Sequence, residues 1–322
     1  MSRRSGLPRR RMLPASARLR VSLTALSLTA IGLSAGSGAA PAQDVEPRAL
    51  SPAPGGTNVL GVALASSWGD VLLDKTLPVE DLDGTIVSLV PSYTRYFNVF
   101  GTSARVSAAV PFATGSWDAT VNEADPVETD ISRTGLGDGV VNATVFLLGA
   151  PAMTREQFRD YRRKTILGFN LRVKLPIGQY DSEKLVNLGS NRWQLAPALG
   201  LSQWFGRFTI EAVAVAWLFS DNTALLGDNV LSQDALWGFQ LNAGYSFRPN
   251  LWLSAGVRQT TGGKTTLNGV KRDDPTENTR LGIVLGIPIA TGHTLKLVGT
   301  TGIRTTAGND FDTLVAQWLY AW

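Results

Sequence analysis

The sequence contains no cysteine, one histidine and three methionines among its 322 residues. Without thiols the chain forms neither disulfide bonds nor thiolate metal sites. It also lacks long hydrophobic runs, since no segment beyond residue 42 approaches the roughly 18 consecutive apolar residues of a transmembrane helix. The mean hydropathy of +0.04 is low for a helical membrane protein. If this protein resides in a membrane, strands must place it there.

An excess of positive charge is also missing once the first 42 residues are set aside. The pI of 9.5 suggests a protein that binds polyanions. However, seven of the 30 basic residues are arginines upstream of residue 43, where there is no acidic residue. The rest of the chain therefore has 23 basic against 26 acidic residues, a net charge of −3. No basic excess is left to bind nucleic acid, and we expect no such partner.

The first 42 residues have the order of a secretory signal peptide. A basic stretch over residues 1–20 precedes an apolar stretch over 21–33, and Ala40-Pro41-Ala42 fits the small-x-small cleavage pattern. An apolar core of roughly a dozen residues is too short to span a membrane easily. We expect residues 1–42 to be removed after export by the general secretory route.

Beyond residue 56 the chain alternates apolar and polar residues with a period of two. In residues 167–175, apolar residues alternate with Gly168, Asn170, Arg172 and Lys174. A strand shows this pattern when one face meets lipid and the other a polar lumen, whereas a helix would scramble the two faces. Twelve segments show the pattern, some of them weakly: 57–68, 84–97, 102–112, 138–148, 167–175, 191–201, 208–219, 236–247, 251–261, 279–289, 294–304 and 311–322.

The connections between these segments alternate between long and short. The long ones are 69–83, 113–137, 176–190, 220–235, 262–278 and 305–310. The others are mostly tight turns, except that residues 149–165 contain a predicted short helix capped by Thr154. Long extracellular loops and short periplasmic turns are typical of outer-membrane barrels.

The sequence therefore predicts an all-β fold. We expect a transmembrane antiparallel up-and-down β-barrel of about 12 strands, with its N- and C-termini in the periplasm. The barrel domain covers residues 57–322, and residues 43–56 form an N-terminal periplasmic segment. The cell outer membrane of a Gram-negative bacterium is the expected location.

The C-terminal segment carries a further pattern. Leu314, Ala316, Trp318, Tyr320 and Trp322 occupy alternate positions up to the last residue. This resembles the terminal signature by which bacterial barrel-assembly machinery recognises its clients. We expect Leu314, Trp318, Tyr320 and Trp322 to act as this assembly signal, with the assembly machinery and outer-membrane lipid as partners.

Several short motifs resemble one protein family. They are Glu46-Pro47-Arg48-Ala49, Pro54-Gly55-Gly56-Thr57-Asn58, Leu77-Pro78-Val79-Glu80-Asp81, Gly135-Leu136-Gly137-Asp138, Leu148-Gly149-Ala150-Pro151-Ala152, Leu175-Pro176-Ile177-Gly178-Gln179-Tyr180-Asp181, Asn187-Leu188-Gly189-Ser190-Asn191-Arg192-Trp193 and Asn309-Asp310-Phe311-Asp312. Over about residues 46–322, the chain resembles the outer-membrane family known as the meta-pathway (MetA) of phenol degradation, often called simply transporter. Members are associated with genes for degrading aromatic compounds. The resemblance implies a channel for passive uptake of small aromatic or hydrophobic compounds.

Charged residues on the polar faces of the strands are the candidate lining of the lumen. They are Arg95, Arg105, Asp138, Arg172, Lys174, Arg192, Arg258, Arg280, Lys296 and Arg304. One interpretation is structural, because buried charges usually form ion pairs, here with Asp138, Glu211 and nearby acids. The other is an anion-favouring lining, as rings of Arg and Lys make in anion pores. Aromatic carboxylates would suit the second interpretation.

Two other functional classes stay open as alternatives. A hydrolase with a Ser-His-acid triad would have to use His293, the single histidine, which the topology places in a periplasmic turn. A structural or adhesive barrel would act through its extracellular loops, chiefly 113–137 and 262–278. We expect neither an enzyme nor a cofactor or metal site, and the predicted partner is a small permeant.

Overall fold

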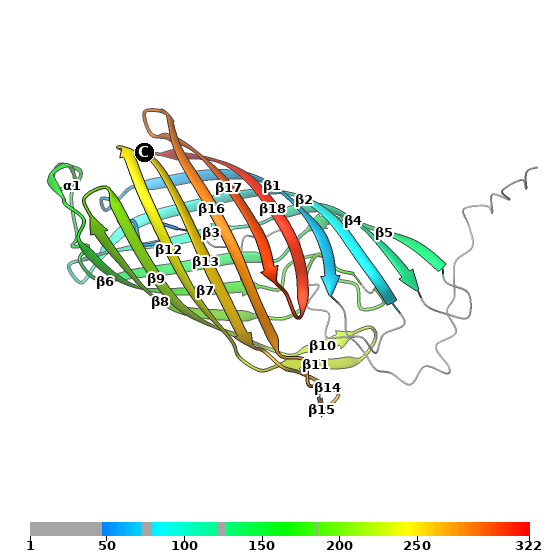
Figure 1. Cartoon of the computed structure of the whole chain (residues 1–322). Helices are drawn as coiled ribbons and strands as arrows, with labels where there is room; N and C mark the ends of the chain where they lie inside the picture. Colours follow the sequence, from blue (N-terminus) through cyan, green and yellow to red (C-terminus); the bar gives the residue numbers. More distant parts are fainter. Residues whose placement is uncertain (1–46, 73–78, 122–126, 185) are drawn as a thin grey trace, which may run out of the picture.

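The computed structural model describes residues 47–72, 79–121, 127–184 and 186–322 (Figure 1). The predicted signal peptide at 1–42 lies outside these residues.

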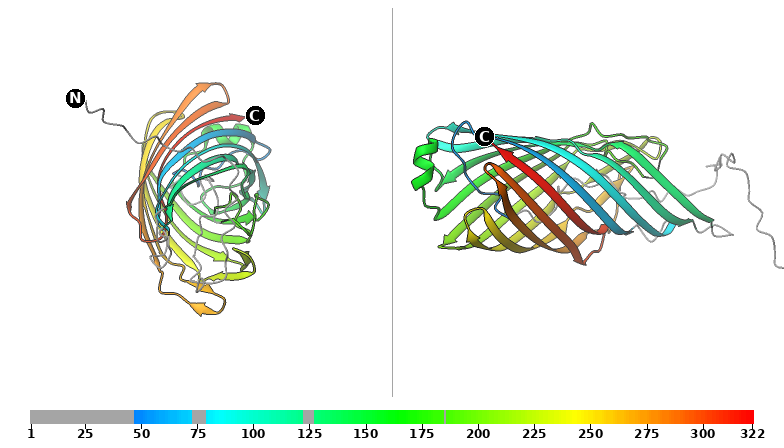
Figure 2. Two further views of the ribbon diagram at one scale, coloured as in Figure 1. Left: turned by 90° about the vertical axis from the view of Figure 1, so that its right-hand side faces the viewer. Right: turned by 90° about the horizontal axis from the view of Figure 1, so that it is seen from above.

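Twelve antiparallel strands form a closed barrel, which the left panel of Figure 2 shows nearly end-on. They follow one another around the wall in sequence order, and β1 pairs with both β2 and β18 to close it. The strands are β1 (Asn58–Leu72), β2 (Val79–Val99), β3 (Thr102–Ala109), β6 (Gly139–Leu148), β7 (Thr165–Leu175), β8 (Gln194–Phe205), β9 (Phe208–Phe219), β12 (Leu236–Arg248), β13 (Leu251–Gly262), β16 (Thr276–Ala290), β17 (His293–Arg304) and β18 (Gly308–Ala321). The predicted all-β barrel and its strand number are confirmed.

A hairpin extends one side of this barrel. β4 (Phe112–Val121) and β5 (Val127–Leu136) continue β3 and β6, and β2 pairs with β4 over its first half and with β3 over its second. Figure 1 and the right panel of Figure 2 show this wall projecting past the other strands. The prediction of a loop over 113–137 is wrong. The exposed face of β4 carries polar residues such as Thr114 and Ser116, so a search for lipid-facing apolar residues misses the strand.

The two ends of the barrel differ. At the end called here the turn end, short turns join the strands, and Asn58 N–H donates to the carbonyl of Trp322 at 3.1 Å. The turn end also carries α1 (Arg155–Asp160), which begins with the predicted capping box of Thr154 and Gln157. At the opposite loop end, two long connections pair to form a second, four-stranded sheet of β10 (Asn222–Leu225), β11 (Asn229–Gln233), β14 (Thr265–Leu267) and β15 (Val270–Lys271).

The two faces of the wall strands have opposite character. In β12, the outward side chains of Trp237, Phe239 and Leu241 are 52%, 57% and 53% exposed. Gln240 and Asn242, which alternate with them, are buried toward the lumen. An apolar outer surface of this extent is stable against lipid hydrocarbon rather than against water.

In the part of the chain that the structure describes, no helix is long and apolar enough to cross a membrane.

Candidate functional site

The barrel encloses a cavity of about 300 Å³ between its strands. Its polar lining comes from Arg105, Arg172 and Arg258, together with the amide side chains of Asn142, Asn170 and Gln240. Its apolar lining comes from alanines, valines and the indole of Trp217, and includes Ala63, Val90, Val140, Ala198, Val213 and Val215. The cavity therefore offers an apolar solute both a hydrophobic wall and groups that bind a polar substituent.

Two of the arginines are tied to their surroundings. Arg258 Nε donates to Gln240 Oε1 at 3.0 Å, and its guanidinium carbon lies 5.8 Å from the centre of the Trp217 ring. Arg105 Nη2 donates to the carbonyl of Ala49 at 2.6 Å, and Nη1 donates to the Tyr96 hydroxyl at 3.3 Å. Guanidinium groups held in this way keep fixed positions in the cavity.

The segment that precedes β1 lies inside the barrel. Besides the contact of Ala49 with Arg105, the Tyr96 hydroxyl donates to the carbonyl of Ser51 at 3.3 Å and Ser103 Oγ to that of Ala53 at 3.4 Å. The sequence predicts a periplasmic segment at 43–56. Within the described part of it, Ala49 and Leu50 line the cavity.

Two glycines make room for Leu50, which is only 6% exposed. A Cβ atom would lie 2.6 Å from Leu50 Cδ2 at Gly168 of β7, and 3.0 Å from Leu50 Cδ1 at Gly200 of β8. A side chain at either position would require Leu50 to shift. The wall is thus shaped to receive this leucine, which the alternating pattern of the sequence does not reveal.

Arg48 anchors the same segment. Its backbone N–H donates to Glu211 Oε2 at 2.5 Å, and Nη2 donates to Ser246 Oγ at 2.6 Å. Its guanidinium carbon lies 4.4 Å from the ring centre of Trp252 and 5.1 Å from that of Trp204. Burial and the neighbouring Arg163 lower the pKa of Arg48 to about 10, opposed by Glu211, so that the group stays charged at neutral pH.

A buried ionic cluster lies toward the loop end. Asp138, between β5 and β6, has a fully buried side chain and accepts from Ser190 N at 2.9 Å, Ser190 Oγ at 2.5 Å and Gly178 N at 3.1 Å. Lys174 Nζ lies 3.5 Å from Asp138 Oδ2. Arg192 is also buried and lies over the Phe219 ring at 4.5 Å. Asp138 therefore fastens the long β7–β8 connection to the barrel wall.

The remaining predicted lumen residues lie apart from the cavity and from this cluster. Arg95 is exposed near the turn end, where Nη1 donates to Asn58 Oδ1 at 2.9 Å. Arg304 forms an exposed ion pair with Glu277 at 3.1 Å. Lys296 is half-buried on β17. The predicted set thus divides among the cavity, the Asp138 cluster and the strand ends.

The wall has a seam between β17 and β18. Their pairing ends at Thr300 and Thr313, although each strand stays paired with its other neighbour toward the loop end. Arg280 of β16 bridges this region, because its Nη2 donates to the carbonyl of Phe311 at 2.5 Å. A side chain, rather than a continued ladder of backbone hydrogen bonds, fastens the strands there.

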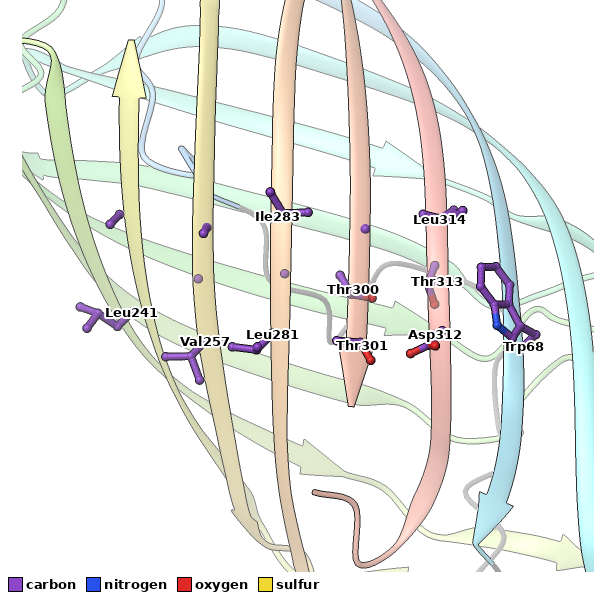
Figure 3. Close-up of a pocket in the computed structure, with 15 residues that line it drawn as sticks. Trp68, Leu241, Val257, Leu281, Ile283, Thr300, Thr301, Asp312, Thr313 and Leu314 are labelled. Atoms are coloured by element: carbon purple, nitrogen blue, oxygen red, sulfur yellow. The ribbon is translucent and has the colours of Figure 1, made fainter. Parts of the chain in front are cut away.

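An apolar hollow of about 720 Å³ opens on the wall beside this seam (Figure 3). It extends from Leu241 of β12 across the wall to Trp68 of β1. Gly299 forms part of its floor, where a Cβ atom would meet Ile283 at 3.5 Å and Leu314 at 3.6 Å. The hollow suits an apolar molecule or a lipid chain.

His293 lies in an aromatic stack. Its ring centre is 4.5 Å from that of Tyr320 and 5.6 Å from that of Trp318, with nearly parallel planes. Tyr320 also stacks on Trp322 at 5.2 Å. The C-terminal aromatic residues and the single histidine therefore form one cluster at the turn end.

Comparisons with known proteins agree with this architecture. A family model described as "Putative MetA-pathway of phenol degradation" matches residues 55–318. No curated protein sequence matches the chain.

Solved structures of outer-membrane barrels are similar to the chain. An outer membrane channel from Pseudomonas putida F1 has a TM-score of 0.70 and 19% identity, with 87% of this chain and 100% of that chain covered. The beta domain of the Bordetella autotransporter BrkA has a TM-score of 0.45 and 14% identity over 83% of this chain and 100% of that one. The CymD monoaromatic hydrocarbon channel has a TM-score of 0.38 and 10% identity over 84% and 88%. The likeness to the Pseudomonas putida channel shows the fold of a bacterial outer-membrane barrel.

Proposed function

Because the chain belongs to this phenol-degradation family, we propose that it is a passive outer-membrane channel for small aromatic or hydrophobic compounds. The observation that carries the proposal is the lumen cavity of about 300 Å³, in which an apolar wall faces amide and guanidinium groups. Ligand sites of this kind are mostly apolar with a few polar groups that fix orientation. A benzene ring with one polar substituent, as in phenol, matches both the apolar and the polar part of the lining.

The charge of the cavity favours anions. Arg105, Arg172 and Arg258 all contribute to its lining. Arg and Lys side chains that line pores select anions. Among aromatic compounds, carboxylates and phenolates therefore fit better than compounds that carry a positive charge.

Residues 48–53 contact the inside of the wall at the turn end, and we infer that an axial route opens when this segment moves. We place the turn end in the periplasm, where short turns are usual, and the loop end outside the cell. The seam between β17 and β18 supplies a second route. An apolar solute could leave there from the lumen into the hollow beside Gly299 without crossing the polar turn end.

The test compares two substitutions of the same kind on opposite faces of the wall. Ala198 lines the cavity, whereas Ala143 on β6 is exposed on the outer face. Ala198→Phe places a ring in the lumen, and Ala143→Phe places the same ring against lipid. Uptake of a radiolabelled aromatic carboxylate is measured in cells that lack the native gene and express each variant at equal levels in the outer membrane.

We expect Ala198→Phe to reduce the initial uptake rate at least fivefold, a loss of about 1 kcal/mol in passage. Ala143→Phe should leave the rate within twofold of the unchanged protein. Equal rates in the two variants, or uptake no greater than in cells without the protein, would sink the proposal.

Catalysis forms no part of this proposal. The contacts of His293 are stacking contacts with Trp318 and Tyr320, which suit an interfacial aromatic residue. An esterase activity that disappeared in His293→Ala would favour the hydrolase alternative. We also propose that the secretory leader is removed on export and that the C-terminal residues up to Trp322 guide assembly.

A further inference from the structure

The barrel wall forms a receptor for one guanidinium group, which at present belongs to Arg48. Trp204 of β8, Ser246 of β12 and Trp252 of β13 contact its side chain, and Glu211 of β9 binds its backbone N–H. Arg163, which precedes β7, also lies over the Trp204 ring, at 5.1 Å. The rest of the receptor is built by strands of the wall, and Arg48 is carried by the segment before β1.

The receptor is held in place without Arg48. Gly286 of β16 makes room for Trp252, since a Cβ atom there would lie 2.2 Å from Trp252 Nε1. Trp252 is 6% exposed and Glu211 is 5% exposed. The close fit against Gly286 orients the Trp252 indole through a wall contact that does not involve Arg48.

The chemistry of the receptor selects its ligand. Two indole faces attract a cation through their ring quadrupoles, and a desolvated contact of this kind is worth about 2 kcal/mol. Ser246 Oγ accepts an N–H donor at 2.6 Å. The Glu211 carboxylate, which binds the backbone N–H of Arg48, supplies negative charge to both Arg48 and Arg163. A quaternary ammonium ion has no N–H to give. A planar cation with several N–H donors satisfies both requirements.

We propose that Trp204, Trp252, Ser246 and Glu211 form a binding site for free alkylguanidinium and amidinium cations, which compete with Arg48 for it. Binding of such a cation releases Arg48 and so loosens the segment that closes the lumen. This site is separate from the cavity proposed for the permeant, because it lies where Arg48 anchors residues 48–53. It is tested by direct binding.

Because Arg48 is held near the site by its own chain, free cations compete with it only weakly in the unchanged protein. A group held by a short segment acts at an effective concentration of about a millimolar or more. A free cation must exceed that concentration to displace Arg48. Removing the Arg48 side chain abolishes the competition and leaves the receptor vacant.

The experiment titrates ethylguanidinium into the purified full-length barrel in detergent micelles, followed by tryptophan fluorescence and by calorimetry. Arg48→Ala should bind it saturably and at least tenfold more tightly than the unchanged protein. N-ethylurea, which has the same shape without the charge, should not bind. Tetramethylammonium should bind at least fivefold more weakly than ethylguanidinium.

Matched variants test the position of the site. Arg155→Ala removes an exposed arginine from α1 and should behave as the unchanged protein does. Adding Trp252→Leu to Arg48→Ala should weaken binding at least tenfold. Folding of each variant is checked by heat-modifiable migration in gel electrophoresis. If Arg48→Ala does not fold by this criterion, Arg48→Met replaces it.

Three results would overturn the proposal. These are a folded Arg48→Ala protein without saturable binding, equal binding of N-ethylurea, and unchanged binding after Trp252→Leu. None of them bears on aromatic uptake, so the failure of this proposal and that of the channel proposal are distinguishable.

Discussion

Replacing Asp138 by asparagine should release the β7–β8 connection from the wall. The side chains of Asp138 and Lys174 are 0% and 7% exposed. Breaking a buried ion pair by removing one partner costs about 3 to 5 kcal/mol, because the other charge stays buried without compensation. Asparagine keeps an acceptor for Gly178 N, so we take the lower value, about 3 kcal/mol. That corresponds to a roughly 100-fold larger population of the open connection.

Hydrogen exchange followed by mass spectrometry measures this opening directly. The amide of Gly189 donates to the carbonyl of Gln179 at 2.9 Å and reports on the connection without touching Asp138. In Asp138→Asn, we expect exchange across residues 186–193 to accelerate roughly 100-fold, while β9 and β12 keep their protection.

Two further variants of the chain serve as controls for the electrostatic argument. Asp273 and Lys264 form an ion pair at 2.5 Å, but the Asp273 side chain is 90% exposed. Asp273→Asn should therefore accelerate exchange in its own loop by less than about fivefold, as expected for a pair worth below 1 kcal/mol. Asp138→Asn combined with Lys174→Met should recover part of the lost protection, because no orphaned lysine remains. Equal exchange in the single and double variants would refute the reasoning.

Two other substitutions address the closed lumen. Gly200→Val places methyl groups where Leu50 sits, since even a Cβ atom there lies 3.0 Å from Leu50 Cδ1. This substitution should raise the single-channel open probability in planar bilayers at least fivefold. An unchanged open probability would contradict the proposal that residues 48–53 block the lumen. Arg280→Ala removes the link to Phe311 across the seam and should at least double the uptake of a neutral aromatic compound in cells. An unchanged rate would remove the seam as a route.

The strands that face lipid could be predicted from the sequence because lipid imposes a strict alternation. In β12 the outward residues Trp237, Phe239 and Leu241 are large and apolar. The hairpin of β4 and β5 could not be found in this way. It extends the wall where the outward residues are polar, as at Thr114, so the same fold leaves a different pattern there.

The candidate site could be predicted only in part from the sequence. The alternation along the strands indicated which cations face the lumen, and Arg105, Arg172 and Arg258 do line the cavity. The position of residues 48–53 inside the barrel could not be predicted, because Leu50 fits where Gly168 and Gly200 have no side chain. In an alternating strand, a glycine on the polar face looks like any other small residue.

The structural and functional interpretations of the lumen cations apply to different residues. Lys174 lies beside a fully buried carboxylate, and in that pair the two charges offset each other. Arg258 is tied to Gln240 and Arg105 to Ala49, which are neutral groups. A hydrogen bond to a neutral acceptor orients a guanidinium group. The Asp138 cluster therefore stabilises the barrel, while the arginines contribute guanidinium groups to the lining of the cavity.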